Sequence, residues 1–287
     1  MTGGALALAL GAAFLHALWN VLLAGSRDSV AATGALLLFG VVLLAPAALL
    51  SGGFSSGALS SEALPFVAAS AALELAYFVL LARAYRGGEL GVVYPVARGS
   101  APVLVLGAAV FGLGKGVPVL AALGVILVAA GVLLLGLSSV GPQTRHMRDQ
   151  EGPHSRDLAI GLAIGVAIAG YTLVDSEGLD HADPLPYLFL IAAVCAAAYN
   201  GALMATGRAR QLQQALNARM LAAAAATFGA YAMVLAALEL APAAPVAAVR
   251  ESSIVIAAVM AWLFLGEERR LTGAVLVAAG VAVIAYS

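Results

Sequence analysis

Ten long apolar segments divide this sequence, and they constrain its fold more than any other feature. A helix needs about 20 mostly apolar residues to cross a bilayer. Ten segments reach or approach that length: residues 4–24, 30–51, 63–85, 91–113, 117–139, 158–174, 184–206, 217–240, 245–266 and 271–286. None alternates like a barrel strand, and backbone groups in lipid must be paired internally. The sequence therefore predicts an all-α integral membrane protein with ten transmembrane helices.

The scarcity of charge supports this interpretation. Of the 287 residues, 63% are hydrophobic and 10% are charged, and the mean hydropathy is +1.02. A soluble domain carries about 25% charged residues, so this chain has too few to cover a surface that faces water. We therefore expect a lipid bilayer around it. The net charge of −1 offers no basic field for nucleic acid. The first apolar run has no preceding Lys or Arg, so we interpret it as a span rather than a cleavable signal peptide.

A stretch of nine residues occurs nearly twice. Residues 124–132 read GVILVAAGV and residues 273–281 read GAVLVAAGV. The two glycines of each copy lie seven residues apart, close to two helical turns, so they share one helix face. Small residues on one face let two helix backbones approach closely inside a membrane. We therefore expect these two helices to pack face to face and to join two related halves.

The two halves align at an offset near 152, which matches Arg98 with Arg250 and Ser100 with Ser252. Five helices is an odd number, so two such units in tandem must be inverted relative to each other. Inverted repeats are common in secondary transporters, which bind substrate at the repeat interface. The predicted organisation is a first five-helix repeat (1–140), a polar linker (141–157) and a second five-helix repeat (158–287). An internal pseudo-dimer of this kind favours a monomer.

The basic residues are distributed unevenly between the two sides of the predicted bundle. Lys115 is the only one on one side. The other side holds eleven arginines: Arg27, Arg83, Arg86, Arg145, Arg148, Arg156, Arg208, Arg210, Arg219, Arg269 and Arg270. By the positive-inside rule the arginine-rich side is cytoplasmic. Both termini of this multi-pass protein are then predicted to be periplasmic.

Four ionisable residues stand out within the predicted spans, namely Glu74, Arg98, Arg250 and Glu251. Each costs about 2.5–3.5 kcal/mol to insert, so each is a functional candidate by default. The tight hairpin around Gly88 brings Glu74 within side-chain reach of Arg98, which predicts an ion pair between them. Such a pair either serves a substrate or only fixes helix packing.

Polar and aromatic residues accompany these charges. His16, Trp19 and Asn20 share one face of the first span, at positions i, i+3 and i+4. His16 there either packs in the core or lines a polar cavity. Their counterparts in the sixth span are Tyr171, Thr172 and Asp175, although Asp175 can also be the end of that helix.

Two further features mark the cavity wall. Tyr77 and Tyr231 lie too deep in their spans to be interfacial anchors. Tyr94 precedes a proline within the span 91–113, and Pro245 opens the span 245–266. Proline inside a span permits a kink where the freed carbonyl faces a cavity or a neighbouring helix. We expect these two spans to line the cavity and to move, with plain kinked core helices as the alternative.

The sequence contains no phosphate-binding loop and no HExxH motif, so we expect neither an enzyme nor a cofactor. The single cysteine, Cys195, lies in an apolar span, where we expect it to be inert. His146 and His154 lie eight apart in the polar linker without a third ligand in view, which favours a solvated linker over a metal site. Any transport would then be driven by gradients or by exchange.

The sequence resembles the drug/metabolite transporter superfamily, specifically its ten-helix EamA-type members, over nearly the whole chain. The features that carry the resemblance are Trp19–Asn20, Phe264-Leu265-Gly266-Glu267 followed by Gly273 and Gly280, and Gly114-Lys115 followed by Gly124 and Gly131. The family pattern has Gly-Glu after helices 4 and 9. In the first half Lys115 stands where the family pattern has glutamate, so a role of that glutamate carboxylate is less well supported there. The spaced glycines also resemble the last helix of small multidrug-resistance proteins.

The resemblance implies export of small organic metabolites, including amino acids, across the bacterial inner membrane. One branch is similar to aromatic amino-acid exporters. No substrate residue carries over by motif, so the candidate site depends on the residues themselves. Arg98 and Arg250 would hold a carboxylate, and Glu74 or Glu251 an amino group. The remaining candidates are Trp19, Tyr77, Tyr94, Tyr171 and Tyr231 for an apolar side chain, with His16, Asn20, Ser100 and Ser252 beside them.

Two other classes stay open. A multidrug exporter of lipophilic cations needs a deep acidic residue, for which Glu74 is the candidate. A membrane-embedded enzyme acting on lipid-linked substrates needs several polar catalytic groups at an interface, and the short loops here supply few.

Overall fold

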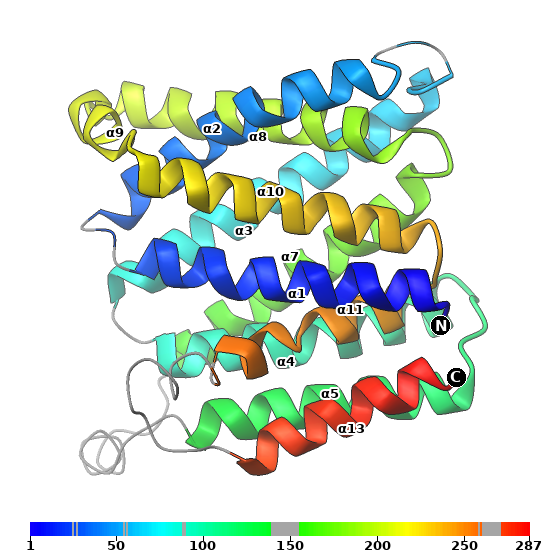
Figure 1. The fold of residues 1–287 in the computed structure, drawn as a ribbon. Helices are drawn as coiled ribbons and strands as arrows, with labels where there is room; N and C mark the ends of the chain where they lie inside the picture. The colour runs from blue at the N-terminus through cyan, green and yellow to red at the C-terminus, as the bar shows by residue number, and fades with distance from the viewer. Residues whose placement is uncertain are drawn as a thin grey trace.

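A computed structural model describes residues 1–24, 26, 28–53, 55, 57–87, 90–138, 155–257, 259 and 271–287. The helical elements in chain order are α1 (Gly3–Ala24), α2 (Ser29–Leu50), η1 (Ser61–Ala63), α3 (Leu64–Gly87), α4 (Leu90–Gly107), η2 (Ala108–Gly112), α5 (Val119–Ser138), α7 (Ser155–Gly178), α8 (Pro184–Ala205), α9 (Ala209–Ala215), α10 (Ala218–Leu238), α11 (Ala243–Arg250) and α13 (Leu271–Ala285). Figure 1 shows the long helices running between two ends of one bundle, with both termini at the same end and α9 at the other.

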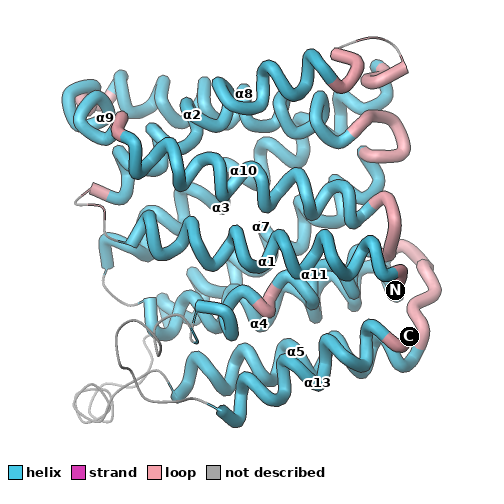
Figure 2. Tube along the Cα trace, in the orientation of Figure 1, coloured by secondary structure: helices cyan, strands magenta, loops and turns pink. Residues whose placement is uncertain are grey.

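Eight helices of the described ranges are long and apolar enough to cross a membrane, and they match the first eight predicted spans. Nearly every described residue outside the short connections is helical (Figure 2). The all-α membrane architecture therefore agrees with the prediction, whereas the number of ten spans stays a prediction. The last predicted span corresponds to α13, which has 15 residues. Residues 141–154 of the predicted linker lie outside the described residues, and 155–157 already belong to α7.

The ninth predicted span, 245–266, is not one continuous helix. The helix α11 ends at Arg250, a turn follows at Glu251–Ser252, and helix resumes over residues 253–257. The N–H groups of Glu251 and Ser252 donate to carbonyls three residues back, at 3.0 Å each, so the chain tightens there. Serine is a weaker helix former than alanine or leucine, and irregular backbone is tolerated at membrane depth where protein buries it. The turn is buried. Residues 260–266, which include the Phe264–Gly266 motif, lie outside the described residues.

The repeated glycines bring α5 and α13 into close contact. A Cβ atom placed on Gly131 would lie 2.8 Å from the carbonyl oxygen of Gly273, and one placed on Gly280 would lie 2.7 Å from that of Gly124. The first glycine of each copy thus faces the second glycine of the other, so the two helices are antiparallel. The predicted packing of these two helices is confirmed. An antiparallel pair of similar helices is what an inverted repeat requires, and the repeat itself stays a prediction.

Most of the other extensive helix contacts also join the two halves of the chain, whereas α4 packs on α5 within the first half. The helix α1 packs on α10, α2 packs on α8, and α7 packs on both α3 and α4. The α5–α13 pair and the α2–α8 pair lie at opposite edges of the bundle in Figure 1. The middle of the bundle is therefore built from α1, α3, α4, α7, α10 and α11, and the buried ionisable residues lie there.

A charged cap at the start of α2 makes stability depend on pH. Asp28 Oδ1 accepts the N–H groups of Val30 and Ala31 at 3.1 Å each, and its Oδ2 accepts Arg208 Nη2 at 2.5 Å. Burial acts to raise the pKa of Asp28, but the hydrogen bonds from Ala31, Arg208 and Val30 outweigh it, so the pKa lies below its usual value. Since the folded pKa is the lower one, this stabilisation is present above the unfolded value of about 3.9 and is lost as the pH falls through the folded value.

We therefore expect Asp28→Ala to lower the free energy of unfolding by about 1 kcal/mol at pH 7, and by less at pH 3. Asn217, whose Oδ1 accepts the N–H of Met220 at 3.1 Å, caps α10 without a charge. Asn217→Ala is thus the matched control, with a loss that does not vary with pH. Chemical unfolding in detergent at the two pH values measures both effects. Equal pH dependence in the two variants would contradict the role of the Asp28 charge.

Candidate functional site

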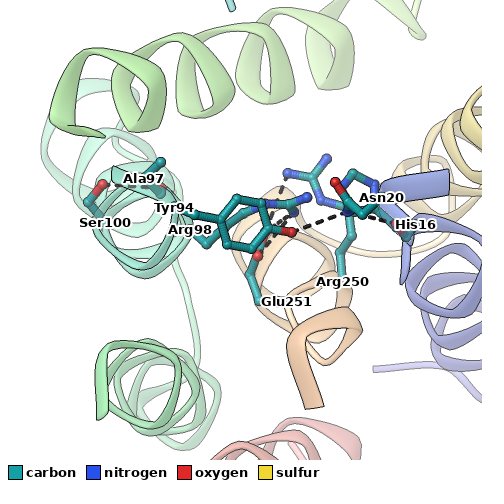
Figure 3. Close-up of polar contacts among 8 residues, drawn as sticks. All are labelled: His16, Asn20, Tyr94, Ala97, Arg98, Ser100, Arg250 and Glu251. Carbon is teal, nitrogen blue, oxygen red and sulfur yellow. Dashed lines mark hydrogen bonds and ion pairs between the residues drawn. The ribbon is translucent and has the colours of Figure 1, made fainter. Parts of the chain in front are cut away.

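The turn after α11 gathers three charged side chains in the middle of the bundle. Arg98 Nη1, on α4, lies 3.2 Å and 3.1 Å from the two carboxylate oxygens of Glu251. Arg250 Nη2 lies 3.7 Å from Glu251 Oε1. All three side chains are buried: Arg98 is 3% exposed, Glu251 0% and Arg250 4%. Figure 3 shows them pointing toward one another. Two arginines thus share one carboxylate, which leaves one positive charge to be balanced by other groups.

The predicted ion pair between Glu74 and Arg98 is wrong, because Arg98 pairs with Glu251 instead. The prediction assumed that helices joined by a tight hairpin also pack along their length. Here α3 and α4 both pack mainly on α7 and contact each other only slightly. The partner of Arg98 comes from residue 251, more than 150 residues further along the chain, and hairpin geometry cannot reveal such a partner.

Glu74 instead belongs to a second acidic group, formed with Asp175 of α7. Both are buried, at 5% and 1% exposed. Asp175 Oδ1 accepts the hydroxyl of Tyr187 at 3.1 Å, and its Oδ2 accepts the hydroxyl of Tyr231. Glu74 interacts electrostatically with Asp175, Tyr231 and Arg250. The two carboxyl groups therefore lie close to the arginine that is only partly neutralised by Glu251.

Tyr187 is a site residue that the sequence prediction missed, and Asp175 is one whose role the sequence did not decide. Asp175 lies inside α7, which continues to Gly178, so the alternative that it ends the helix is wrong. Its four-residue spacing from Tyr171 places both on one helix face, and that spacing was the available signal. Tyr187 lies near the start of α8, where a tyrosine usually anchors the interface. Here Tyr187 is fully buried and lies against Asp175 and Gly178 of α7.

A cavity of about 50 Å³ lies between these groups. Its lining residues are His16, Trp19, Glu74, Tyr77, Phe78, Tyr171, Thr227, Phe228, Ala230, Tyr231, Val234 and Arg250. A buried water needs about 10–15 Å³, whereas ligand pockets are typically about 300–1,000 Å³. The cavity therefore has room for a few waters, and the surrounding helices must move apart to admit a metabolite.

Aromatic rings form one continuous wall of this cavity. The ring centroids of Tyr77 and Tyr171 are 6.2 Å apart, and those of Tyr171 and Tyr231 are 6.0 Å apart. The ring of His16 meets that of Trp19 edge-on, with centroids 5.2 Å apart. His16 thus lines the cavity rather than only packing in the core. Five of the sequence candidates therefore come together as a wall that is apolar on its ring faces and polar at its edges.

Several donors in this wall have no hydrogen-bond partner among the described residues. They include Arg250 Nε and Nη2, and Trp19 Nε1. A buried donor without a partner costs about 1–3 kcal/mol, and more when it is charged. Arg250 and Trp19 both line the cavity, so an anion in the cavity can accept from them.

Asn20 and Tyr94 support Arg98 rather than line the main cavity. Asn20 Nδ2 donates to the carbonyl oxygen of His16 at 2.8 Å and to the hydroxyl oxygen of Tyr94 at 3.2 Å. The Arg98 guanidinium carbon lies 5.3 Å from the centre of the Tyr94 ring, close enough for a cation–π contact. These contacts connect α1 to α4 and hold the Arg98 side chain in place (Figure 3).

The two serine candidates are placed differently. Ser100 donates to the carbonyl oxygen of Ala97 at 3.3 Å and lies on the side of α4 away from Glu251 (Figure 3). A Cβ on Gly165 would lie 2.1 Å from Ser100 Oγ, so Ser100 packs against α7 and does not join the site. Ser252 is buried in the turn directly after Glu251. Ser100 and Ser252, which correspond in the alignment of the two halves, therefore lie in different environments.

Within the described residues, no three His, Cys, Asp or Glu side chains are grouped so that they could hold a metal ion. The Cys195 thiol is buried and donates to the carbonyl oxygen of Ala71 at 3.4 Å. The described side chains of the site offer ion pairing, hydrogen bonding and ring stacking.

Comparison with known proteins gives two findings. Residues 157–286 match the EamA-like transporter family. A solved crystal structure is similar to this chain with a TM-score of 0.73 and 14% sequence identity, over 100% of this chain and 98% of that chain. At that identity the similarity establishes the fold alone. No curated protein sequence matches.

Proposed function

We propose that this chain, whose residues 157–286 match the EamA-like transporter family, is a membrane transporter of small molecules that exports amino acids by alternating access. The donors of Arg250 carry this proposal. Its Nε and Nη2 groups are buried and lack hydrogen-bond partners among the described residues, and Arg250 borders the cavity. Guanidinium groups bind carboxylates with charge-assisted hydrogen bonds, so Arg250 suits the α-carboxylate of an amino acid.

The amino group has an acidic counterpart in the same cavity. Glu74 lines the cavity together with Arg250, and Asp175 lies close behind it. A cavity with a cation and a carboxylate in reach of one ligand suits a zwitterion. Since Glu251 is already paired with Arg98, we assign the amino group to Glu74 and treat the Arg98–Glu251 pair as the support of Arg250.

The tyrosine wall suits the remaining part of the substrate. Tyr77, Tyr171 and Tyr231 present ring faces and hydroxyl edges together, which accommodates an apolar or aromatic side chain. The branch of aromatic amino-acid exporters would fit such a wall.

Alternating access follows from the proposed inverted repeat. The antiparallel α5–α13 contact and the helix break at Glu251–Ser252 support it. Transporters built from inverted repeats bind substrate at helix breaks between the two repeats. We place the arginine-rich end in the cytoplasm of the cell and both termini in the periplasm, as the distribution of arginines indicates, and we propose a monomer.

Replacing Arg250 by Gln tests the proposal. We expect amino-acid affinity to fall about tenfold to hundredfold, because hydrogen bonds to charged groups contribute about 1.5–3 kcal/mol. The measurement is binding and flux of the twenty amino acids in proteoliposomes. Arg210→Gln is the matched control, because Arg210 is an exposed residue of α9 at the far end of the bundle. If Arg250→Gln leaves the affinity for every transported amino acid unchanged, the assignment of Arg250 is wrong.

Export of lipophilic cations is the second candidate. Two buried carboxyl groups beside three tyrosines also suit a cation, since anionic groups and aromatic faces both attract positive charge. Tetraphenylphosphonium uptake, abolished by Glu74→Gln and unaffected by Arg250→Gln, would favour it. The available cationic donors of Arg250 favour the amino acid.

A further inference from the structure

The charge balance at the centre of the bundle is uneven. Glu74, Arg98, Asp175, Arg250 and Glu251 are the buried ionisable acids and arginines among the described residues. With all five ionised, two positive charges face three negative ones. Uncompensated charge in a low-dielectric interior is costly. One bound proton would make the group neutral.

His16 does not change this balance. A protonated His16 would add a third positive charge, but both Arg98 and Arg250 oppose a positive charge at that position. Its Nε2 has no hydrogen-bond acceptor among the described residues, as expected for a neutral ring that does not donate there. The extra proton therefore belongs on a carboxyl group.

The hydrogen bonds distinguish the three carboxyl groups. Glu251 accepts from Arg98 through both oxygens. Asp175 accepts one tyrosine hydroxyl on each oxygen, from Tyr187 and Tyr231, and such bonds favour the ionised form. Among the described residues Glu74 makes no ion pair within 4.0 Å. Glu74 is thus the carboxyl group with the weakest support for a negative charge.

Donor counting at Tyr231 supports one proton bound by this pair of acids. A phenol has a single hydrogen, yet the Tyr231 hydroxyl contacts both Asp175 and Glu74. One hydrogen cannot serve two ionised carboxylates, whereas a proton bound by one of the two acids completes the arrangement. Asp175 also accepts the hydroxyl of Tyr187, which leaves that proton to Glu74.

We propose that Glu74 holds one exchangeable proton and that the ammonium group of the substrate displaces it. The coupling part of this proposal rests on the proposed function. The O–H bond of Glu74 breaks, the proton leaves to water in the opened cavity, and the new carboxylate pairs with the ammonium group. Release of the substrate reverses these steps. Export of one zwitterion is then exchanged for one inward proton, so the cycle moves one positive charge inward.

The charged and titratable groups around Glu74 come from six helices. They are Tyr77 on α3 itself, Asp175 and Tyr171 on α7, Tyr187 and Cys195 on α8, Tyr231 on α10, Arg250 on α11, and His16 on α1. Arg250 is the only cation among the described members of this set. Removing it or one acid therefore changes the number of protons that the group binds.

Infrared spectroscopy of the purified protein at pH 7, with the side-chain carboxyl of glutamate labelled with carbon-13, tests the proton site directly. We expect a protonated-carboxyl band that shifts with the label and is absent from Glu74→Gln. We also expect the band to be absent from Asp175→Asn, because two positive and two negative charges then balance without a proton. In Arg250→Gln one positive charge faces three acids, so two protons bind and the band should be about twofold stronger. Glu177→Gln, at a partly exposed residue outside the buried group, is the control that keeps the band. The absence of a band in the labelled wild type, or a band that does not shift with the label, overturns the assignment without any variant.

Transport distinguishes the proton site from the proposed function. We expect a pH gradient to drive uptake of at least one of the twenty amino acids into proteoliposomes, with Glu74→Asp retaining this and Glu74→Gln losing it. If the infrared band behaves as expected and no amino acid responds to the gradient, the amino-acid function fails and the proton site stands. If an amino acid is transported without a response to pH, the coupling fails while the function stands.

Discussion

Glu251→Gln is expected to lower the free energy of unfolding by about 3–5 kcal/mol, the usual loss when one partner of a buried ion pair is removed. Glu251 is fully buried and is the carboxylate that Arg98 and Arg250 share. Without it, two guanidinium groups face each other across the turn after α11. Unfolding of the purified protein in detergent, followed by circular dichroism against denaturant, measures the loss.

The matched control is Glu177→Gln, the same substitution in a surface pair. Glu177 pairs with Lys115 and both are substantially exposed, so the expected loss is about 0–1 kcal/mol. Adding Arg98→Gln to Glu251→Gln removes one of the two opposing charges, so the double variant should be more stable than Glu251→Gln alone. If the three variants are equally stable, the charges at the turn do not hold the fold together.

Gly131→Val is expected to be the other severe change, because it forces α5 away from α13. Even a Cβ atom there would lie 2.8 Å from the Gly273 carbonyl oxygen and 2.8 Å from the Val277 nitrogen. These are backbone atoms, so relief requires a shift of the whole helix. Overpacking of this kind costs about 1–3 kcal/mol, sometimes more, and close packing is a main source of helix association in lipid. The same unfolding measurement gives the loss.

Gly201→Ala separates this effect from the loss of a glycine as such. Gly201 lies in α8, with no atom within 4 Å of the position its Cβ would take. Alanine there should stabilise the helix by about 0.5–1 kcal/mol. Gly131→Ala should instead be destabilising. If both alanine variants are stabilised, α5 and α13 do not approach as closely as the structure places them.

Much of the fold could be predicted because hydropathy and helix length carry it. Eight spans are continuous apolar helices that end near polar or turn residues, so their positions follow from local sequence. The α5–α13 contact could be predicted because both helices carry two glycines at the same seven-residue spacing, Gly124 and Gly131 in one and Gly273 and Gly280 in the other. The break at Glu251–Ser252 could not, since it depends on the partner that Glu251 finds on α4.

The candidate site was predicted in composition rather than in pairing. Trp19, Tyr77, Tyr171 and Tyr231 were recognised from their depth or helix face, and they do meet around one cavity. The partners of Arg98 and Glu74 were not, because side chains that meet across the bundle leave no mark in sequence spacing. Asp175 was left ambiguous because the apolar run ends just before it, although its helix continues.

The pairing of Arg98 with Glu251 has a consequence for the rate at which such a carrier changes state. Arg98 lies in the first half of the chain and Glu251 in the second, so the proposed rocking of one half against the other would stretch this pair. That stretch would add an electrostatic contribution to the energy barrier. If the substrate offers its own carboxylate to the arginines, as proposed above, it would replace one anion by another and lower that contribution. Loading would then accelerate the movement, and an empty carrier would return more slowly.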